Sequence, residues 1–221
     1  MTPSFVLTDI EGTTTPIAFV RDTLFPYARA RLADWLAAHA DSPVLADVPG
    51  DRHATLLAWM DADRKETALK EIQGSIWAAG YADGSLKGAL YPEVAAQLRA
   101  WAGRGVGVGV YSSGSVAAQK LLFGHSLAGD LLLLFQAFFD TRVGAKREAE
   151  SYRRIAGQLR LAPAAILFLS DVEAELDAAR EAGFLSFQLV RAPDGTLASA
   201  RHPHGPDFTA VAHAFNLPEP P

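Results

Sequence analysis

The pattern of apolar and polar positions divides the chain into three stretches of different texture. A short apolar run over 5–7 stops at an acid, and a brief β-prone run of this kind predicts a buried strand. Over 17–90, apolar residues recur at helical spacing without a strand signal, and Pro26 should kink the first helical segment or begin its second helix. From Tyr91 onward, short apolar runs alternate with helical patterns. The pattern therefore predicts an all-helical block set into an alternating helix–strand region.

Each stretch predicts elements with definite bounds. In the helical block we expect helical segments over 19–39 and 53–72, separated by a loop over 41–51. Beyond the block we expect helices over 93–103, 115–123, 148–161 and 173–182, and strands over 106–111, 138–140, 165–169 and 185–190. The proline-rich tail, 218–221, is expected to fray.

The order of these elements predicts an α/β fold. Strands that alternate with helices at this spacing indicate a Rossmann-like, mainly parallel sheet with helices on both faces and right-handed crossovers. Because the helical block follows the first strand at once, it would lie above the carboxyl edge of the sheet as a lid. We therefore expect a core domain of 1–16 and 91–221 and a helical cap domain of 17–90. Gly107 and Gly109 would let a helix or the first strand's loop approach the sheet closely.

Composition and charge narrow the class of protein. The 221 residues are 49% hydrophobic and 20% charged, which is typical of a globular protein with an ample core. A net charge of −5 without a basic run argues against nucleic-acid and membrane-surface partners. The chain has no cysteine and no visible signal peptide, and its longest apolar run, 131–135, is too short to span a bilayer. We therefore expect a soluble, cytoplasmic protein, a monomer rather than an oligomer, with a small-molecule partner.

Two acids, Asp9 and Glu11, follow the first predicted strand directly, and Gly12 and a run of threonines come after them. Gly12 can turn the chain sharply past the strand end. Ligands of open α/β sheets bind beyond the carboxyl ends of the strands, where these acids would lie beside a loop of amide and hydroxyl donors. Taken alone, the segment also fits a solvated turn, because Asp and Gly are frequent in turns.

Three later strand ends carry the polar groups that a phosphoryl-transfer site at Asp9 needs. Ser112 and Ser113 precede a helix N-terminus, which favours anions, although alone the two serines would be helix caps; Ser113 or Ser115 is able to cap that helix. Lys146 supplies a cation, and Asp171 ends the clearest predicted strand. In such a set one carboxylate attacks phosphorus, the acid two residues on donates and takes protons, and Mg²⁺ with the lysine neutralises the phosphate. Two carboxylates and a backbone carbonyl suffice for Mg²⁺, which keeps several waters.

Several other residues admit two interpretations. Glu175 would approach the metal through water, or would be an early-helix acid favoured by the helix dipole. Trp77 and Tyr81 would be packing residues, or would line an apolar pocket for part of the substrate. The histidines of 202–204 and His125 are interpreted as solvated residues and not as metal ligands.

Five segments carry a resemblance to a known family. They are Asp9–Thr14, Tyr111–Ser115, Gln119–Gly124, Lys146–Tyr152 and Phe168–Asp171, and the helical block adds Gln73–Trp77 with Gly80 and Tyr81. Their order resembles that of the haloacid-dehalogenase superfamily of aspartate-nucleophile phosphatases. Glu11 stands where most of that superfamily has a second aspartate, and this narrows the resemblance to the enolase-phosphatases of methionine salvage. The resemblance runs from Phe5 to about Val190.

The resemblance implies a bifunctional enzyme with one Mg²⁺ ion per chain and no organic cofactor. It would enolise 2,3-diketo-5-methylthiopentyl-1-phosphate and then hydrolyse the phosphate to release the acireductone. It implies a metal site of Asp9, Glu11 and Asp171 and a substrate site of Ser112, Ser113 and Lys146. Asp9 would be the nucleophile and Glu11 the general acid/base, with Lys146 stabilising the developing enolate oxygen. A glutamate with an ordinary pKa of about 4.3 needs burial or a partner for that role, and a closed cap would exclude water.

Rival functions lie within and outside this superfamily. One is a phosphatase that acts on another small phosphate ester, because the core motifs do not select the ester. A carbon–halogen hydrolase on the same scaffold has no phosphate to neutralise. The rival from another class is a non-catalytic phosphoacceptor switch, in which an aspartate takes phosphate and signals.

Overall fold

The computed structural model describes residues 2–221, which form two compact units. One unit comprises the residues up to Ile17 together with Gly88–Pro221, and the other comprises Ala18–Lys87. The strands of the first unit are β1 (Phe5–Thr8), β2 (Gly107–Tyr111), β3 (Ala137–Phe139), β4 (Ile166–Ser170), β5 (Leu185–Leu189) and β6 (His204–Gly205). Its helices are α5 (Val94–Gly103), α6 (Val116–Gly124), α7 (Ala149–Leu159), α8 (Glu173–Glu181) and α9 (Phe208–Phe215), with short 3₁₀ turns at Leu132–Leu134, Pro163–Ala165 and Ala192–Asp194.

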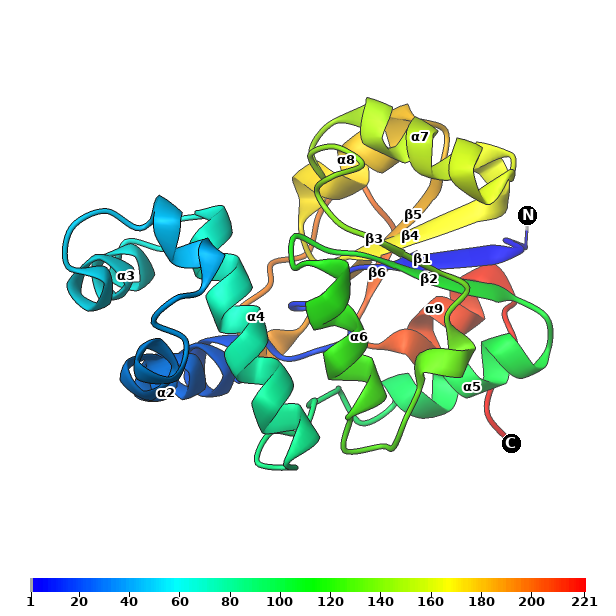
Figure 1. Ribbon diagram of the computed structural model, residues 1–221. Coiled ribbons are helices and arrows are strands. Elements are labelled where there is room, and N and C mark those ends of the chain that lie inside the picture. Colours follow the sequence, from blue (N-terminus) through cyan, green and yellow to red (C-terminus); the bar gives the residue numbers. More distant parts are fainter. Residues whose placement is uncertain (1) are drawn as a thin grey trace. The chain divides into compact units, whose positions relative to one another are not determined.

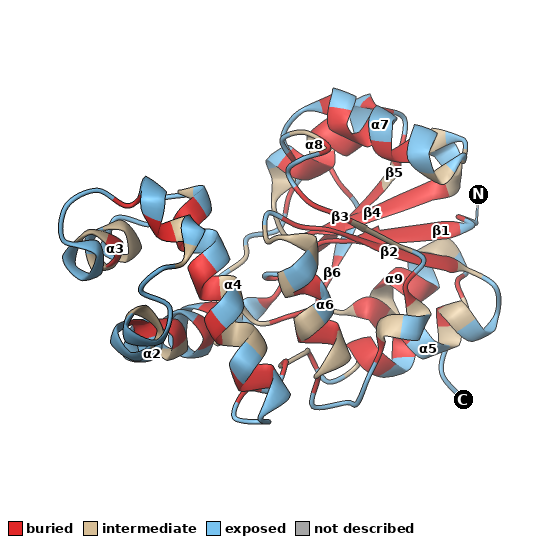
Figure 2. Ribbon diagram, in the orientation of Figure 1, coloured by how far each residue is buried: buried red, intermediate tan, exposed pale blue. Residues whose placement is uncertain are grey.

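The first unit is a six-stranded sheet in the order β3-β2-β1-β4-β5-β6, and all five strand pairings are parallel. Helices α7 and α8 cover one face, and α5, α6 and α9 cover the other (Figure 1). The predicted α/β class with a parallel sheet and helices on both faces is therefore confirmed. The central strands are buried on both sides (Figure 2), as their unbroken apolar runs predict.

The glycines of β2 make room for a side chain of the neighbouring strand. A Cβ built on Gly107 would lie 2.4 Å from the Phe5 ring, and one on Gly109 would lie 2.9 Å from it. Phe5 thus packs across β2 within the core beneath α7 and α8, together with Tyr152 and Phe168. The expectation that a helix or the first strand's loop fills this space is wrong, because the space is already taken by an aromatic ring.

The second unit is helical throughout its regular elements. They are the π-helical turn Val20–Leu24, α2 (Phe25–Ala38), the 3₁₀ turn Pro43–Asp47, α3 (Arg52–Asp61) and α4 (Thr67–Ala82), preceded by α1 (Ile17–Phe19) at the junction of the two units. Pro26 lies in the first turn of α2, so it begins a second helical segment as predicted. The apolar stripes of α2, α3 and α4 meet in one cluster that includes Leu32, Leu56 and Ile72.

The predicted single helical segment over 53–72 is wrong. The chain leaves the helix after Asp61 and begins α4 only at Thr67. Asp63 adopts a left-handed backbone conformation with φ of 46°, which interrupts a helix. Residues 61–66 are charged except for the exposed Ala62, so the segment buries no large apolar side chain that would hold it helical.

The C-terminal segment is more ordered than the sequence predicts. Neither β6 nor α9 was expected, yet Phe208 of α9 stacks on Trp101 of α5 with ring centroids 5.3 Å apart. The Pro218 carbonyl accepts a hydrogen bond from Gln97 Nε2 at 2.5 Å, and the Glu219 carboxylate lies 3.2 Å from His213 Nε2. His202 is buried and hydrogen-bonded to Asp177 and Ser186, so its expected solvation is wrong. Within 2–221, none of the helices has the length and apolar character that crossing a bilayer requires.

Candidate active site

Residues 9–14, which we call the acid loop, lie at the centre of the carboxyl edge of the sheet. Thr8, the last residue of β1, pairs with Val110 of β2 on one side and Leu169 of β4 on the other. Asp9 therefore emerges between the loops that follow β2 and β4. The chain continues from β1 to β2 on one side and from β4 to β5 on the other, so a switch point lies between β1 and β4, and open α/β sheets bind ligands at such a point.

The turn after Asp9 is held by its own side chains. Asp9 Oδ1 accepts a hydrogen bond from the Ile10 amide at 2.7 Å, and Thr14 Oγ1 donates to the Ile10 carbonyl at 3.2 Å. Thr13 Oγ1 accepts from the Asp171 amide at 3.1 Å. These threonine hydroxyls bind backbone groups, so they help to fix the loop. Glu11 is solvent-exposed.

Lys146 joins the acid loop to α8. Its Nζ lies 2.7 Å from Asp9 Oδ2 and 2.6 Å from Glu175 Oε2, and all three side chains are buried. Burial opposes the charged ammonium, but the two carboxylates outweigh it and raise the pKa of Lys146 above its ordinary value. Glu175 also accepts a hydrogen bond from Ser170 Oγ at 2.9 Å. Glu175 is therefore more than an early-helix acid, because it is a charge partner of the lysine.

The loop that carries Lys146 is fastened by three hydroxyl groups. Tyr152 donates to the Lys146 carbonyl at 2.7 Å, Ser151 to the Ala145 carbonyl at 2.8 Å and Tyr111 to the Gly144 carbonyl at 2.9 Å. Sequence reasoning assigned none of these hydroxyls a role at the site. The only available signal was a tyrosine at the end of a predicted strand and another on a helix just after the lysine. The three hydrogen bonds hold the main chain around Lys146 and so set where its ammonium group lies.

The loop after β2 presents its serines differently. Ser112 is buried and its Oγ accepts a hydrogen bond from the Gly114 amide at 3.3 Å, whereas Ser113 is exposed. The cap of α6 is Ser115, whose Oγ accepts from the Ala118 amide at 3.2 Å. The interpretation of Ser112 and Ser113 as simple helix caps is therefore wrong. Asp140, which the sequence did not single out, accepts from the Val116 amide at 3.3 Å and ties this loop to the one after β3.

The charges at the strand ends fit a divalent cation. Burial, followed by the charge of Asp9, raises the pKa of Asp171 to about 7. Its Oδ1 is buried and has no hydrogen-bond partner within the part of the chain that the structure describes. The carboxylates of Asp9 and Glu175 thus flank the Lys146 ammonium group, and the charges of all three residues act on Asp171. Carboxylate oxygens that lack protein partners are the ligands that Mg²⁺ prefers.

Side chains alone do not complete a metal site. Among the described residues, no group of three or more His, Cys, Asp or Glu side chains is arranged to hold a metal ion. Mg²⁺ is usually bound by one or two carboxylates with waters and other oxygens, so a site of two carboxylates and a main-chain carbonyl meets its needs. The carboxylates of Asp9 and Asp171 supply the side-chain part of such a set.

Gly12 is the contact point between the acid loop and Asp171. Its φ is +67°, and a Cβ there would lie 2.5 Å from Asp171 Oδ2. We expect Gly12→Ala to displace the Asp171 carboxylate and to weaken Mg²⁺ binding by about 10-fold or more. Isothermal titration of Mg²⁺ into the metal-free protein measures this effect.

Gly50→Ala is the matched control for Gly12→Ala. Gly50 has a φ of +64°, but a Cβ there would meet no atom within 4 Å. Both variants should lose about 1 kcal/mol of stability from backbone strain, and only Gly12→Ala should lose Mg²⁺ affinity. Equal Mg²⁺ affinity in the two variants would show that Asp171 does not depend on the approach at Gly12.

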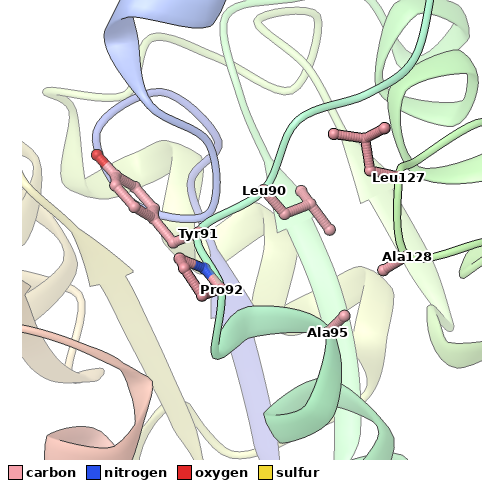
Figure 3. A pocket seen from close by; sticks show the side chains of 6 residues that line it. All are labelled: Leu90, Tyr91, Pro92, Ala95, Leu127 and Ala128. Carbon is pink, nitrogen blue, oxygen red and sulfur yellow. The ribbon is translucent and has the colours of Figure 1, made fainter.

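The first unit also has an apolar pocket that none of these charged residues lines. It has a volume of about 220 Å³ (Figure 3) and is lined by Leu90, Tyr91, Pro92, Ala95, Leu127 and Ala128. None of these lining residues is charged, so the pocket does not suit a phosphate group.

The chain belongs to the haloacid dehalogenase-like hydrolases, whose family model matches residues 4–183. Curated relatives that match nearly the whole chain identify the family within this class. The chain is 54% identical to enolase-phosphatase E1 of Granulibacter bethesdensis, with 99% of both chains covered. It is also 54% identical to enolase-phosphatase E1 of Acidiphilium cryptum, over 99% of this chain and 98% of that one. The chain therefore belongs to the enolase-phosphatase family, as its motifs predict.

A solved structure agrees with this assignment. The UTR4 protein of Saccharomyces cerevisiae superimposes with a TM-score of 0.84 at 33% identity, covering 93% of this chain and 98% of that chain. The similarity thus includes nearly all of the residues that form the two units described above.

Proposed function

We propose that this chain is a Mg²⁺-dependent enolase-phosphatase of methionine salvage. It converts 2,3-diketo-5-methylthiopentyl-1-phosphate into the acireductone 1,2-dihydroxy-3-keto-5-methylthiopentene and phosphate. One observation carries the proposal: the Asp9 carboxylate is held by Lys146 at the end of β1, beside Asp171, in a chain 54% identical to enolase-phosphatases. This constellation suits phosphoryl transfer, which needs a placed nucleophile and concentrated positive charge.

Asp9 is the nucleophile of the phosphatase step. One carboxylate oxygen attacks phosphorus, the bond between phosphorus and the substrate's C1 oxygen breaks, and Glu11 donates a proton to the departing oxygen. Glu11 then takes a proton from a water molecule that attacks the phosphoaspartate, which releases phosphate and restores Asp9. The electron pairs and protons of the two halves balance without an oxidant or reductant.

Positive charge at the site comes from Lys146 and the metal. The side chains of Asp9 and Asp171 and the main-chain carbonyl of Glu11 are proposed to hold one Mg²⁺ ion, and this choice is supported by Asp171 Oδ1, which has no hydrogen-bond partner within 2–221. When bound, Mg²⁺ supplies charge neutralisation for the phosphate oxygens. Lys146, Ser112 and Ser113 bind the substrate phosphate, and the Lys146 ammonium also stabilises the developing enolate oxygen of the first step.

The remaining assignments concern the domain organisation, oligomeric state and location of the enzyme. We assign the role of cap domain to the helical unit, because it is inserted between the acid loop and β2. A monomer that acts in the cytoplasm on a small phosphate ester agrees with the composition of the chain and with its lack of cysteine.

The test is turnover of the diketone phosphate beside a panel of other small phosphate esters. We expect Mg²⁺-dependent formation of both the enol, followed by its ultraviolet absorbance, and free phosphate, and we expect chelation of Mg²⁺ to abolish phosphate release. Faster turnover of another ester, with no enol formed from the diketone, would indicate a phosphatase of different specificity. A stable phosphoprotein without turnover would indicate a phosphoacceptor switch.

A further inference from the structure

Arg191 is a buried cation outside the region shared with the wider superfamily. It lies beyond residues 4–183, which match the haloacid dehalogenase-like family model, and its side chain is 5% exposed. The guanidinium group lies 3.8 Å from the centroid of the Tyr91 ring. Its Nη1 donates a hydrogen bond to the Pro206 carbonyl at 2.8 Å. The group is therefore fixed from several sides.

The second terminal nitrogen of the Arg191 guanidinium donates a hydrogen bond to the acid loop. Arg191 Nη2 donates to the Thr13 carbonyl at 2.7 Å and to Glu93 Oε1 at 2.8 Å. Thr13 is the residue whose Oγ1 accepts from the Asp171 amide at 3.1 Å. A continuous series of hydrogen bonds thus runs from Arg191 through Thr13 to the main chain of Asp171.

The same C-terminal segment fixes the two connections between the core and the helical insertion. Asp194 accepts hydrogen bonds from the Ile17 amide, at 3.3 Å, and from the Tyr91 hydroxyl. Burial and the carboxylate of Asp194 raise the pKa of Tyr91, so its hydroxyl remains a donor at neutral pH. The Tyr91 amide donates to the Thr14 carbonyl at 3.0 Å, and its ring points away from Leu90 and Leu127 of the apolar pocket (Figure 3).

A gain in folding stability does not by itself explain why the Arg191 guanidinium is buried beside Glu93. A buried ion pair often contributes no more than apolar side chains of similar volume, because both charges lose their hydration. Arg191 Nε is buried and has no hydrogen-bond partner among residues 2–221, which adds a further cost. The planar guanidinium holds the Thr13 carbonyl, the Pro206 carbonyl and Glu93 at fixed angles. An apolar side chain would not do this.

We propose that Arg191 is a positioning residue that holds Thr13, and through it Asp171, in the arrangement that binds Mg²⁺. The inference rests on the proposed function, since it concerns the metal site of that reaction. The hydrogen bonds of Arg191 go to the Thr13 and Pro206 carbonyls and to Glu93, and not to the residues proposed to bind substrate or metal. It acts by limiting the movement of the two loops that carry the metal-binding carboxylates, and partners of this kind commonly change metal affinity 10–100-fold.

Arg191→Lys is the decisive variant, because it keeps the positive charge near Glu93 but replaces the planar fork by a single ammonium group. We expect Mg²⁺ affinity of the substrate-free protein, measured by isothermal titration, to fall about 10-fold or more. At saturating Mg²⁺, kcat should fall while KM for the diketone phosphate changes little. Glu93→Gln is the control, since its amide oxygen can still accept from Arg191, and it should bind Mg²⁺ as the wild type does.

A second variant tests the other end of the series of hydrogen bonds. Thr13→Val keeps the shape of the side chain but removes the Oγ1 that accepts from the Asp171 amide, and it should lose Mg²⁺ affinity to a similar extent. If Arg191→Lys does not fold, the Mg²⁺ affinity of Thr13→Val remains the test of the link between Thr13 and Asp171. Wild-type Mg²⁺ affinity in either folded variant would overturn the inference. Failure of the wild type itself to bind Mg²⁺ or to turn over the diketone phosphate would instead overturn the proposed function.

Discussion

Asp9→Asn is expected to abolish phosphate release while the protein stays folded. An amide is a very poor nucleophile, and removal of a covalent nucleophile reduces turnover by about 10⁴-fold or more. The Asn amide oxygen can still accept from the Ile10 amide, which Asp9 Oδ1 accepts at 2.7 Å. Enolisation does not need the nucleophile, so the enol phosphate should accumulate. Single-turnover assays that follow the enol absorbance and free phosphate separately measure both outcomes.

Asp207→Asn is a suitable control for this substitution. Asp207 caps α9, where its Oδ1 accepts from the Ala210 amide at 2.8 Å, and Asn serves equally well at such a position. Its phosphate release and its enol formation should equal those of the wild type. Phosphate release by Asp9→Asn at the wild-type rate would remove Asp9 from the chemistry altogether.

Lys146→Met should have the largest effect on the stability of the metal-free protein. The substitution leaves Asp9 and Glu175 buried without the ammonium group that now lies 2.7 and 2.6 Å from them. Removal of one partner from a buried ion pair lowers the free energy of unfolding by about 3–5 kcal/mol. For a chain of this size the corresponding fall in Tm is about 6–20 °C, which calorimetry of the metal-free protein measures.

The exposed Lys70 of α4 provides the comparison for Lys146. Lys70→Met should change the free energy of unfolding by less than about 0.5 kcal/mol, because an exposed lysine away from such a network contributes little. Lys146→Met should also release phosphate about 10²–10³-fold more slowly, because it lacks the charge that stabilises the transferring group. Equal Tm values for the two variants would contradict the description of Lys146 as a buried charge partner.

The parts of the fold that follow from local patterns were predictable from the sequence. The strand at 5–7, the glycine turn after it and the clearest strand at 165–169 each depend on a short apolar run that stops at a polar residue. Because parallel strands end at one edge, the same reasoning brings Asp9 and Asp171 to the ends of neighbouring strands and Lys146 to the same edge of the sheet. The observed contact of Lys146 with Asp9 agrees with that expectation.

The parts that depend on contacts between distant residues were not predictable. Nothing near Arg191 in the sequence indicates that its guanidinium reaches Thr13, which is 178 residues away. The same holds for Tyr152, whose hydroxyl holds the Lys146 carbonyl, and for α9, whose stability depends on packing against Trp101. The break between α3 and α4 was missed because apolar residues on both sides continue the helical spacing, although residues 61–66 cannot sustain a helix.

The central claim is that phosphate passes through a covalent bond to Asp9. Rapid acid quenching of the wild-type enzyme during turnover of the diketone phosphate, followed by mass spectrometry of its peptides, tests this directly. The account predicts one phosphoryl group on the peptide that contains Asp9, absent when the substrate is omitted and absent from Asp9→Asn. Turnover at the full rate with no phosphorylated Asp9 at any time, or with the phosphoryl group on another residue, would contradict it.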